Sequence, residues 1–153
     1  MPETLDLFGQ AEEKISSSFG RIIKKSSLYK SSSWGFKAEN DFFNQVIEVE
    51  TVLQPKEQIY SLLNIEKSLG RQRKDETGYV SRSIDIDILF IDDLIIETPE
   101  LTVPHPRLHL RRFTLVPLNE KWSGKIHPLF NKTIDELLNG CSDEALVIKF
   151  ATI

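Results

Sequence analysis

The chain has 153 residues and a formal net charge of −4, and 40% of its residues are hydrophobic and 27% charged. This composition suits a single globular domain over 1–153, and the acidic balance disfavours nucleic acid as the main partner. Cys141 is the only cysteine, which excludes an internal disulfide, and neither a membrane-length apolar run nor a secretory signal is visible, so we expect a cytoplasmic protein that does not enter a membrane.

Helical and extended patterns alternate in the N-terminal half of the chain. Apolar residues recur at helical spacing from Glu3 to Phe19, and Gly20 ends this predicted helix. Strands are predicted over 22–30 and 42–53, with a serine-rich loop between them. A second helix begins at Pro55 and is capped by Gly70, and its apolar stripe consists of Ile59, Leu62, Leu63 and Leu69.

Short strands and short helices are predicted in the C-terminal half. The segment between Gly70 and Ser83 is polar, charged and aperiodic, which indicates a mobile loop. Ile84–Ile91 is predicted as a strand that turns at Asp92-Asp93 into a second strand ending at Glu97. The remaining predicted elements are a helix over 108–116, a capping-box helix from Thr133 to Gly140 and an edge strand over 147–150. Together the elements predict a layered α+β domain with helices on one face of an antiparallel sheet.

Two aspartates on the strand predicted after Ser83 are the sharpest chemical feature of the sequence. Alternate residues of a strand share a face, so Asp85 and Asp87 point together while Ile86 and its apolar neighbours point into the core. Carboxylates roughly 6.5–7 Å apart along one strand suit hard cations, and magnesium is the natural choice because it is held by carboxylates and substrate phosphates. The alternative is an amphipathic strand with a solvated acidic face, and the aspartates alone leave both interpretations open.

Basic residues flank these aspartates in the sequence. Arg71, Arg73, Lys74 and Arg82 precede them, and Arg107, Arg111 and Arg112 follow, interspersed with His105 and His109. A planar guanidinium donates two hydrogen bonds at once to phosphate oxygens, so arginines beside a carboxylate pair indicate a metal–triphosphate site. Each arginine taken singly is better explained as a solvated surface charge, and it is the set that favours phosphate binding.

Three further side chains carry chemical hints with open alternatives. Glu66 falls within the apolar stripe of the second helix, where a carboxylate is either functional or paired with a nearby arginine such as Arg71 or Arg73. Phe42 and Asn44 share a strand face, so a planar heterocycle could stack on the ring while the amide reads its polar edge. The alternative for this pair is a core phenylalanine beside a strand-end asparagine.

Several stretches of the sequence match one known family. They are Leu69-Gly-Arg-Gln-Arg73, Ser81-Arg-Ser-Ile-Asp-Ile-Asp-Ile-Leu-Phe90 and Leu101-Thr-Val-Pro-His-Pro-Arg-Leu-His109 followed by Arg111-Arg-Phe113, with weaker matches at Phe42-Phe-Asn44 and from Tyr29 to Phe36. In this order and separation the chain resembles the 6-hydroxymethyl-7,8-dihydropterin pyrophosphokinases of folate biosynthesis. The resemblance implies a ferredoxin-like α+β fold and transfer of diphosphate from ATP to the pterin alcohol, with AMP as the second product.

The resemblance also implies roles for individual positions. Two magnesium ions would be held by Asp85 and Asp87, while Arg71 and Arg82 would contact the phosphates and stabilise charge in the transition state. ATP would further be bound by Glu66, Arg73, Thr102, His105 and Arg111. The pterin would lie between Phe42 and Phe113, with its edges read by Asn44 and by a loop that contains Ser31, Ser32 and Trp34. The loop from Arg71 to Arg82 would close over the reactants. We expect the protein to be a monomer or a weak homodimer.

The resemblance is incomplete at the N-terminus. Family members open with a strand that ends in Gly-Ser-Asn, whereas this sequence passes from Met1 almost directly into the first helix. We therefore expect the sheet to lack one interior strand, with unpaired backbone groups and open core surface beside it.

Two alternatives to catalysis stay open. One is a binding module that is disabled by the loss of this strand, and the other is an RNA-binding module built from the arginines and aromatics. The acidic charge and the absence of an aromatic RNP-like run disfavour the second.

Overall fold

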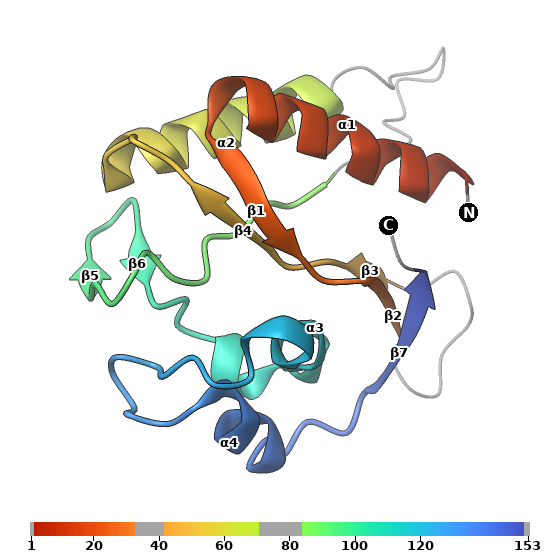
Figure 1. Ribbon diagram of the computed structural model, residues 1–153, viewed down its shortest axis with the longest axis vertical. Helices are drawn as coiled ribbons and strands as arrows, with labels where there is room; N and C mark the ends of the chain where they lie inside the picture. Colours follow the sequence, from red (N-terminus) through yellow and green to blue (C-terminus); the bar gives the residue numbers. More distant parts are fainter. Residues whose placement is uncertain (1, 33–41, 71–83, 152–153) are drawn as a thin grey trace.

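The computed structural model describes residues 2–32, 42–70 and 84–151, and Figure 1 shows its elements in chain colours. In order they are α1 (Pro2–Ser18), β1 (Arg21–Lys25), β2 (Leu28–Ser32), β3 (Phe42–Asn44), β4 (Ile47–Glu50), α2 (Pro55–Gly70), β5 (Ile96–Glu97), β6 (Thr102–Val103), the 3-10 turn η3 (Leu108–Leu110), α3 (Arg112–Trp122), α4 (Ile134–Asn139) and β7 (Leu146–Ala151). The strand pairings within these residues are antiparallel: β1 with β4, β2 with both β3 and β7, and β5 with β6. None of the described helices is long and apolar enough to cross a bilayer. Helices combined with antiparallel sheets confirm the predicted α+β class.

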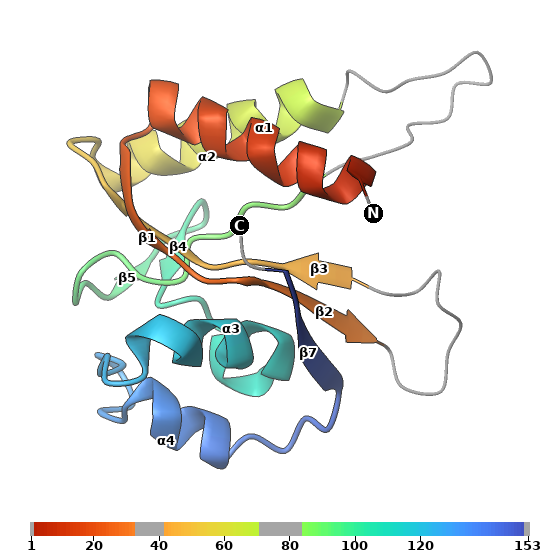
Figure 2. The ribbon, with the colours of Figure 1, turned by 45° about the vertical axis from the view of Figure 1, so that its right-hand side comes forward.

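The helices lie on both sides of the strands, which corrects the prediction of helices on one face. Figure 2 shows α1 and α2 above the strands and α3 and α4 below them. The first pair buries a cluster that includes Ile15, Leu62 and Leu69. The second pair buries a separate cluster that includes Leu115 and Ile134. Because each helix pair has its own apolar face to bury, the strands become the middle layer.

Helix α2 follows most of its sequence pattern. It begins at Pro55, a residue favoured in the first helical turn, and extends through Gly70. Its buried side chains are Gln58, Leu62, Ile65 and Leu69. The predicted stripe is therefore wrong at Leu63, which is exposed, because the buried face is rotated toward Ile65.

Each of the two long strands predicted in the N-terminal half is divided in the structure. The break between β1 and β2 falls at Ser26 and Ser27, which form hydrogen bonds that a regular ladder would not use. The Ser26 hydroxyl accepts from the backbone N–H of Val46 at 3.0 Å. The Ser27 backbone N–H donates to the carboxylate of Glu120 on α3 at 3.0 Å. The halves of each predicted strand consequently join two different sheets.

Gly20 lies where helix α1 gives way to strand β1. A Cβ atom at this position would strike the backbone carbonyl of Glu50 on β4. The Thr51 hydroxyl also donates to the carbonyl of Phe19 at this crossing. The helix therefore ends at a glycine because the chain must pass close to the backbone of β4.

The segment Ile84–Phe90, which is most of the strand predicted over Ile84–Ile91, is not part of any sheet in the described structure. Among the described residues its backbone is held at two points. The N–H of Ile86 donates to the Glu66 carboxylate, and the carbonyl of Leu89 accepts from the N–H of His105 at 2.9 Å. Within the described part of the chain, this segment is therefore held by side-chain packing and by these two bonds rather than by a ladder.

The C-terminal third departs from the predictions in its first elements and agrees in its last ones. The predicted pairing of β5 with the preceding segment is wrong, because β5 pairs with β6. The helix predicted over 108–116 is a 3-10 turn followed by α3, which continues to Trp122. The capping box of Thr133 and Glu136 is confirmed at the start of α4, and β7 is an edge strand as predicted.

Candidate active site

Asp85 and Asp87 project from the segment Ile84–Phe90 into solvent. Both are exposed, while Ile86 and the isoleucines beside it are partly buried against the cluster of α1 and α2. This alternation is the predicted one, although among the described residues no strand ladder supports it. The two carboxylates therefore stand on one side of an extended backbone whose other side is fixed by apolar packing.

Glu66 reaches this segment from helix α2. Its carboxylate accepts the backbone N–H of Ile86, the residue between the two aspartates. Burial raises the pKa of Glu66; the hydrogen bond from Ile86 opposes this shift, and the negative charges of Asp85 and Asp87 add to it. Of the two interpretations of Glu66, this contact supports a role at the aspartate segment, and its alternative arginine partners lie outside the described residues.

His105 and Arg111 complete the group of charges around Asp87. The bond from the His105 N–H to Leu89 anchors the loop after β6 beside the aspartate segment. Burial lowers the pKa of His105, with the charge of Asp87 opposing this shift and that of Arg111 adding to it. Thr102, the other predicted ATP contact here, lies half-buried on β6. This group combines carboxylates, a neutral imidazole and a guanidinium that interact electrostatically. Such a combination is suited to binding a phosphate chain with its counterions.

A second group of predicted site residues lies on strands β2 and β3. Across this pair Tyr29 faces Asn44, and Ser31 faces Phe42. Because these positions alternate along each strand, the four side chains share one face of the sheet. Phe42 is 59% exposed and Ser31 is buried, so the ring is accessible for stacking above a serine. The prediction of Ser31 and Ser32 in a loop is wrong, since both belong to β2.

Phe113 lies beside Arg111, a member of the first group. It belongs to the first turn of α3, and the guanidinium carbon of Arg111 lies 5.4 Å from the centroid of its ring. The start of the helix is held by Asp143, whose carboxylate accepts from the backbone N–H of Arg112 at 2.9 Å. A predicted ATP contact, Arg111, and a predicted pterin contact, Phe113, are therefore neighbours.

Four predicted site residues lie outside the described residues: Arg71, Arg73, Arg82 and Trp34, as does the loop from Arg71 to Arg82. Within the described ranges, no group of three or more His, Cys, Asp or Glu side chains is arranged to hold a metal ion. Asp85 and Asp87 nevertheless fit magnesium as part of a nucleotide complex, since this ion takes one or two carboxylates and completes its shell with phosphate oxygens and water. Their exposure lets such a complex approach.

Two contacts that support these groups are absent from the sequence-based predictions. Glu120 on α3 accepts the hydroxyl of Tyr29 at 2.8 Å, and Asp143 holds the start of the same helix. Both join residues that are distant in the chain, so no local pattern reveals the pairing. The available signal for Glu120 is its position seven residues after Phe113, which places both on one helical face.

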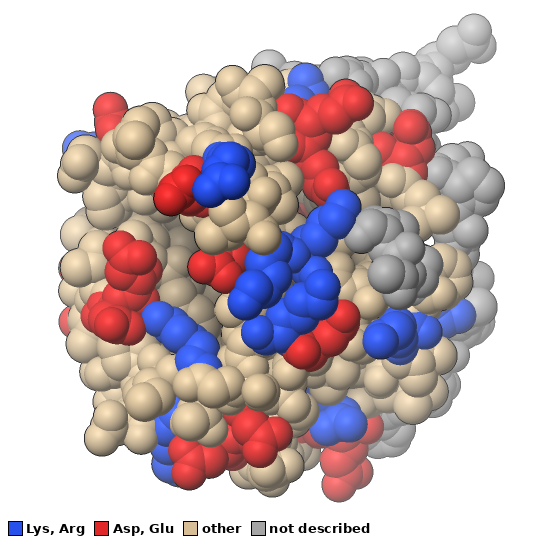
Figure 3. Space-filling view, viewed as in Figure 1, with Lys and Arg blue, Asp and Glu red and all other residues tan. Residues whose placement is uncertain are grey.

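The charged surface in Figure 3 is of mixed sign. Lysine and arginine side chains gather over β1 and α3, and acidic side chains lie beside them in the same view. An RNA-binding face would present a basic stripe without such acidic neighbours. This side of the molecule therefore adds no support to the RNA-binding alternative.

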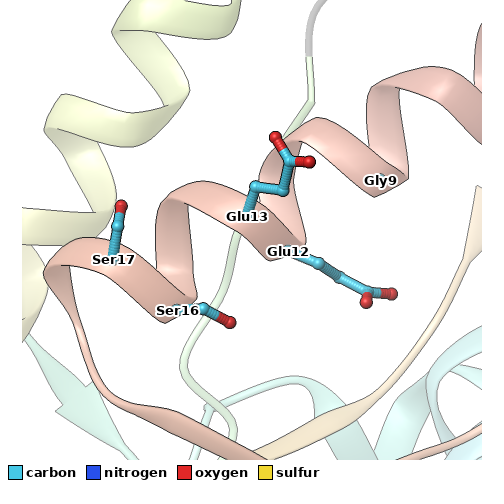
Figure 4. A pocket seen from close by; sticks show the side chains of 5 residues that line it. All are labelled: Gly9, Glu12, Glu13, Ser16 and Ser17. Carbon is cyan, nitrogen blue, oxygen red and sulfur yellow. The ribbon is translucent and has the colours of Figure 1, made fainter.

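An open depression on helix α1 is unsuited to phosphates. It is lined by Gly9, Glu12, Glu13, Ser16 and Ser17. In Figure 4, Glu12 and Ser16 point to one side of the helix and Glu13 and Ser17 to the other. The carboxylates repel anions, and Glu12 is paired with Lys25 at 3.0 Å. None of the residues predicted for the site lines this depression.

Comparison with known proteins points to one family. The family model described as 7,8-dihydro-6-hydroxymethylpterin-pyrophosphokinase (HPPK) matches residues 2–122. The 2-amino-4-hydroxy-6-hydroxymethyldihydropteridine pyrophosphokinase of Aquifex aeolicus (strain VF5) is 39% identical over 127 residues, which cover 83% of this chain and 78% of that protein. The protein of the same name from Porphyromonas gingivalis (strain ATCC 33277) is 34% identical over 116 residues, covering 74% and 79% respectively. The folic acid synthesis protein fol1 of Pneumocystis carinii is 38% identical over 124 residues, covering 81% of this chain and 16% of that longer protein.

Proposed function

The chain belongs to the 7,8-dihydro-6-hydroxymethylpterin-pyrophosphokinase family, and from this membership we propose that it transfers diphosphate from ATP to 6-hydroxymethyl-7,8-dihydropterin in folate biosynthesis. The products are AMP and the pterin diphosphate ester. The observation that carries the proposal is the family match over residues 2–122, a range that includes both groups of site residues. The approach of Glu66 and His105 to the segment that bears Asp85 and Asp87 supports it.

The reaction needs positioning and charge neutralisation rather than a covalent intermediate on the protein. The hydroxymethyl oxygen of the pterin attacks the β-phosphorus of ATP in line with the bond to the α-phosphate, that bond breaks, and AMP leaves as the hydroxyl proton is lost. Asp85 and Asp87 would hold two magnesium ions. When bound, these ions supply positive charge at the reacting phosphates.

On the ATP side, the described residues have separable roles. Glu66 holds the backbone between the aspartates, so it would keep their spacing fixed when the nucleotide binds. Arg111 would donate to phosphate oxygens, and His105 and Thr102 would contact the nucleotide beside it. From the sequence resemblance we also assign an ATP contact to Arg73 and phosphate contacts to Arg71 and Arg82, which would stabilise charge in the transition state.

On the pterin side, the ring system would lie between Phe42 and Phe113, an arrangement in which aromatic faces stack on the bicycle. Asn44 offers an amide donor and acceptor to its polar edge. Ser31 and Ser32 at the end of β2, with Trp34 after them, would line the rest of the pocket. The neighbouring Arg111 and Phe113 would bring the hydroxymethyl group to the phosphates.

Finer properties belong to the same proposal. A ferredoxin-like arrangement of strands and helices and a monomer or weak homodimer follow from the sequence resemblance. A single domain over 1–153 and a cytoplasmic location follow from the length, the composition and the single cysteine. We expect no nucleic acid partner, given the net charge of −4.

The proposal is tested by AMP release from ATP and magnesium, with and without 6-hydroxymethyl-7,8-dihydropterin. We expect AMP formation that depends on the pterin and is abolished by a chelator of magnesium. Folded protein that binds ATP or pterin in a calorimeter but releases no AMP would instead establish the non-catalytic binding module. Circular dichroism of the same preparation must accompany the assay, to show that the protein is folded. This control is needed because Ile84–Phe90, which bears Asp85 and Asp87, is in no sheet among the described residues.

A further inference from the structure

The Glu120 carboxylate ties helix α3 to strand β2 and the residues just before it. It accepts the Tyr29 hydroxyl at 2.8 Å, the Ser27 backbone N–H at 3.0 Å and the Ser27 hydroxyl at 3.2 Å. Tyr29 and Ser27 are both buried, so water competes weakly for these bonds. Burial raises the pKa of Glu120, but the bonds from Tyr29 and Ser27 and the charge of Lys149 outweigh it and leave the pKa lowered. The acceptor is therefore an ionised carboxylate, which forms stronger hydrogen bonds than a neutral group does.

Tyr29 and Glu120 each lie on the same element face as, or directly across from, a proposed pterin contact. Tyr29 is the cross-strand neighbour of Asn44 and lies two residues before Ser31 on the same face of β2. Glu120 lies seven residues after Phe113 on α3, so the two share a helical face and are about 10 Å apart along the axis. The hydrogen bond between Tyr29 and Glu120 thus joins α3 to the β2–β3 pair. These are the same two surfaces that carry the aromatic rings proposed to hold the pterin.

The distance between these two surfaces decides whether a ring fits between them. A planar ring held between two aromatic side chains needs a gap of about 7–8 Å, twice the optimal separation of carbon atoms. We propose that Glu120, acting through Tyr29, sets this gap between Phe42 and Phe113 and is a positioning residue for the pterin. The inference rests on the function proposed above. It gives Glu120 no contact with the substrate, because its acceptor bonds are made to Tyr29 and Ser27.

The first test is Tyr29→Phe, which removes the hydroxyl and keeps the ring. We expect the pterin Kd of the full chain, measured by calorimetry, to rise about three- to tenfold, because losing one charge-assisted bond lets α3 shift on the sheet. The ATP Kd should change by less than about twofold. The matched control is Tyr60→Phe on α2, where the side chain is 49% exposed and lies in a different layer. It should change neither Kd.

The second test asks whether Glu120 acts through Tyr29. Glu120→Ala removes the carboxylate that accepts the Tyr29 hydroxyl and both donors of Ser27. The pterin Kd of the double variant with Tyr29→Phe should be close to that of Glu120→Ala alone, because the Tyr29 hydroxyl then has no carboxylate partner left to lose. Additive effects of the two changes would overturn the coupling.

General loss of stability is tested by Ile134→Val. Ile134 is buried in the cluster of α3 and α4 and takes no part in the bonds of Glu120, and this change costs about 0.5–1.5 kcal/mol. It should lower the melting temperature without raising the pterin Kd; a rise equal to that of Tyr29→Phe would overturn the positioning role. The unmodified chain is measured first. If it neither binds pterin nor releases AMP, the proposed function fails, whereas normal pterin binding with an unchanged Tyr29→Phe variant overturns only the role of Glu120.

Discussion

Glu66 on helix α2 accepts the backbone N–H of Ile86, the residue that separates Asp85 from Asp87. The side chain of Ile86 packs against the cluster formed by α1 and α2. Ile86 is therefore held twice, by its backbone through Glu66 of α2 and by its side chain against the cluster of both helices. Among the described residues, the spacing of the two aspartates consequently depends on these helices rather than on neighbouring strands.

The first prediction concerns this bond. Glu66→Ala leaves the Ile86 N–H without its partner, so we expect kcat/KM for ATP to fall about tenfold, since an unsatisfied, partly buried donor costs about 1–3 kcal/mol. Glu66→Gln keeps an oxygen acceptor for the same N–H and should lose less than about threefold. Steady-state kinetics of both variants make the comparison. Equal losses in the two would show that the charge of Glu66, and not its bond to Ile86, is what ATP requires.

The second prediction concerns the carboxylates themselves. Asp85→Ala or Asp87→Ala should lower kcat by at least about 100-fold, because each removes charge that would hold magnesium at the phosphates. Both side chains are exposed, so the melting temperature should change by no more than a few degrees. Glu97→Ala on β5 is the matched control, since it removes an exposed carboxylate from a nearby strand. Full turnover by either aspartate variant would contradict the metal assignment.

Elements with local signals could be predicted from the sequence. Pro55 at the start of α2 and the Thr133–Glu136 capping box of α4 are confirmed because their hydrogen bonds and backbone preferences lie within a few residues. The divided strands could not be predicted in the same way. The break at Ser26 depends on bonds with Gln45 and Val46 from the neighbouring strand region, and such partners are known only once the fold brings them together.

For the candidate site too, features set by local pattern could be predicted from the sequence, whereas contacts between distant residues could not. Alternation along an extended segment was enough to place Asp85 and Asp87 on one side, whether or not a ladder forms. It was also enough to place Phe42 and Asn44 on one face. The bond between Tyr29 and Glu120 spans 91 positions in the chain, and periodicity within either element carries no information about which partner the other supplies.

The third prediction concerns stacking of the pterin. Phe42→Ala should raise the pterin KM by about tenfold or more, since stacking on an aromatic side chain is worth about 1–3 kcal/mol for a nucleobase of similar shape. The ATP KM should stay within about twofold. Phe150→Ala on β7 is the control, because its ring contacts Phe43, whose side chain lies on the opposite face from Phe42. Similar pterin KM values for the two variants would remove Phe42 from the site.

The fourth prediction concerns the buried imidazole of His127, which is 1% exposed. Its Nδ1 accepts the backbone N–H groups of Leu129 and Phe130, each at 3.2 Å. The ring stacks on Phe130 with centroids 4.3 Å apart. Protonation of Nδ1 would place an N–H against two N–H donors. Burial lowers the pKa of His127, and the charges of His109 and Lys125 add to this shift.

The sign of the pH dependence follows from that lowered pKa. Between the folded pKa and the unfolded value of about 6.5, the unfolded chain binds more protons at His127 than the folded chain does. The stabilisation from this residue is thus complete above about pH 6.5 and is lost as the pH falls through the folded pKa. His127→Asn keeps an acceptor oxygen near the position of Nδ1 but does not titrate. Urea denaturation at pH 7.5 and pH 5.5 should therefore show a larger loss of unfolding free energy for the unmodified chain than for His127→Asn. Because every other titrating group is common to both proteins, equal losses would mean that protonation of His127 is not coupled to folding.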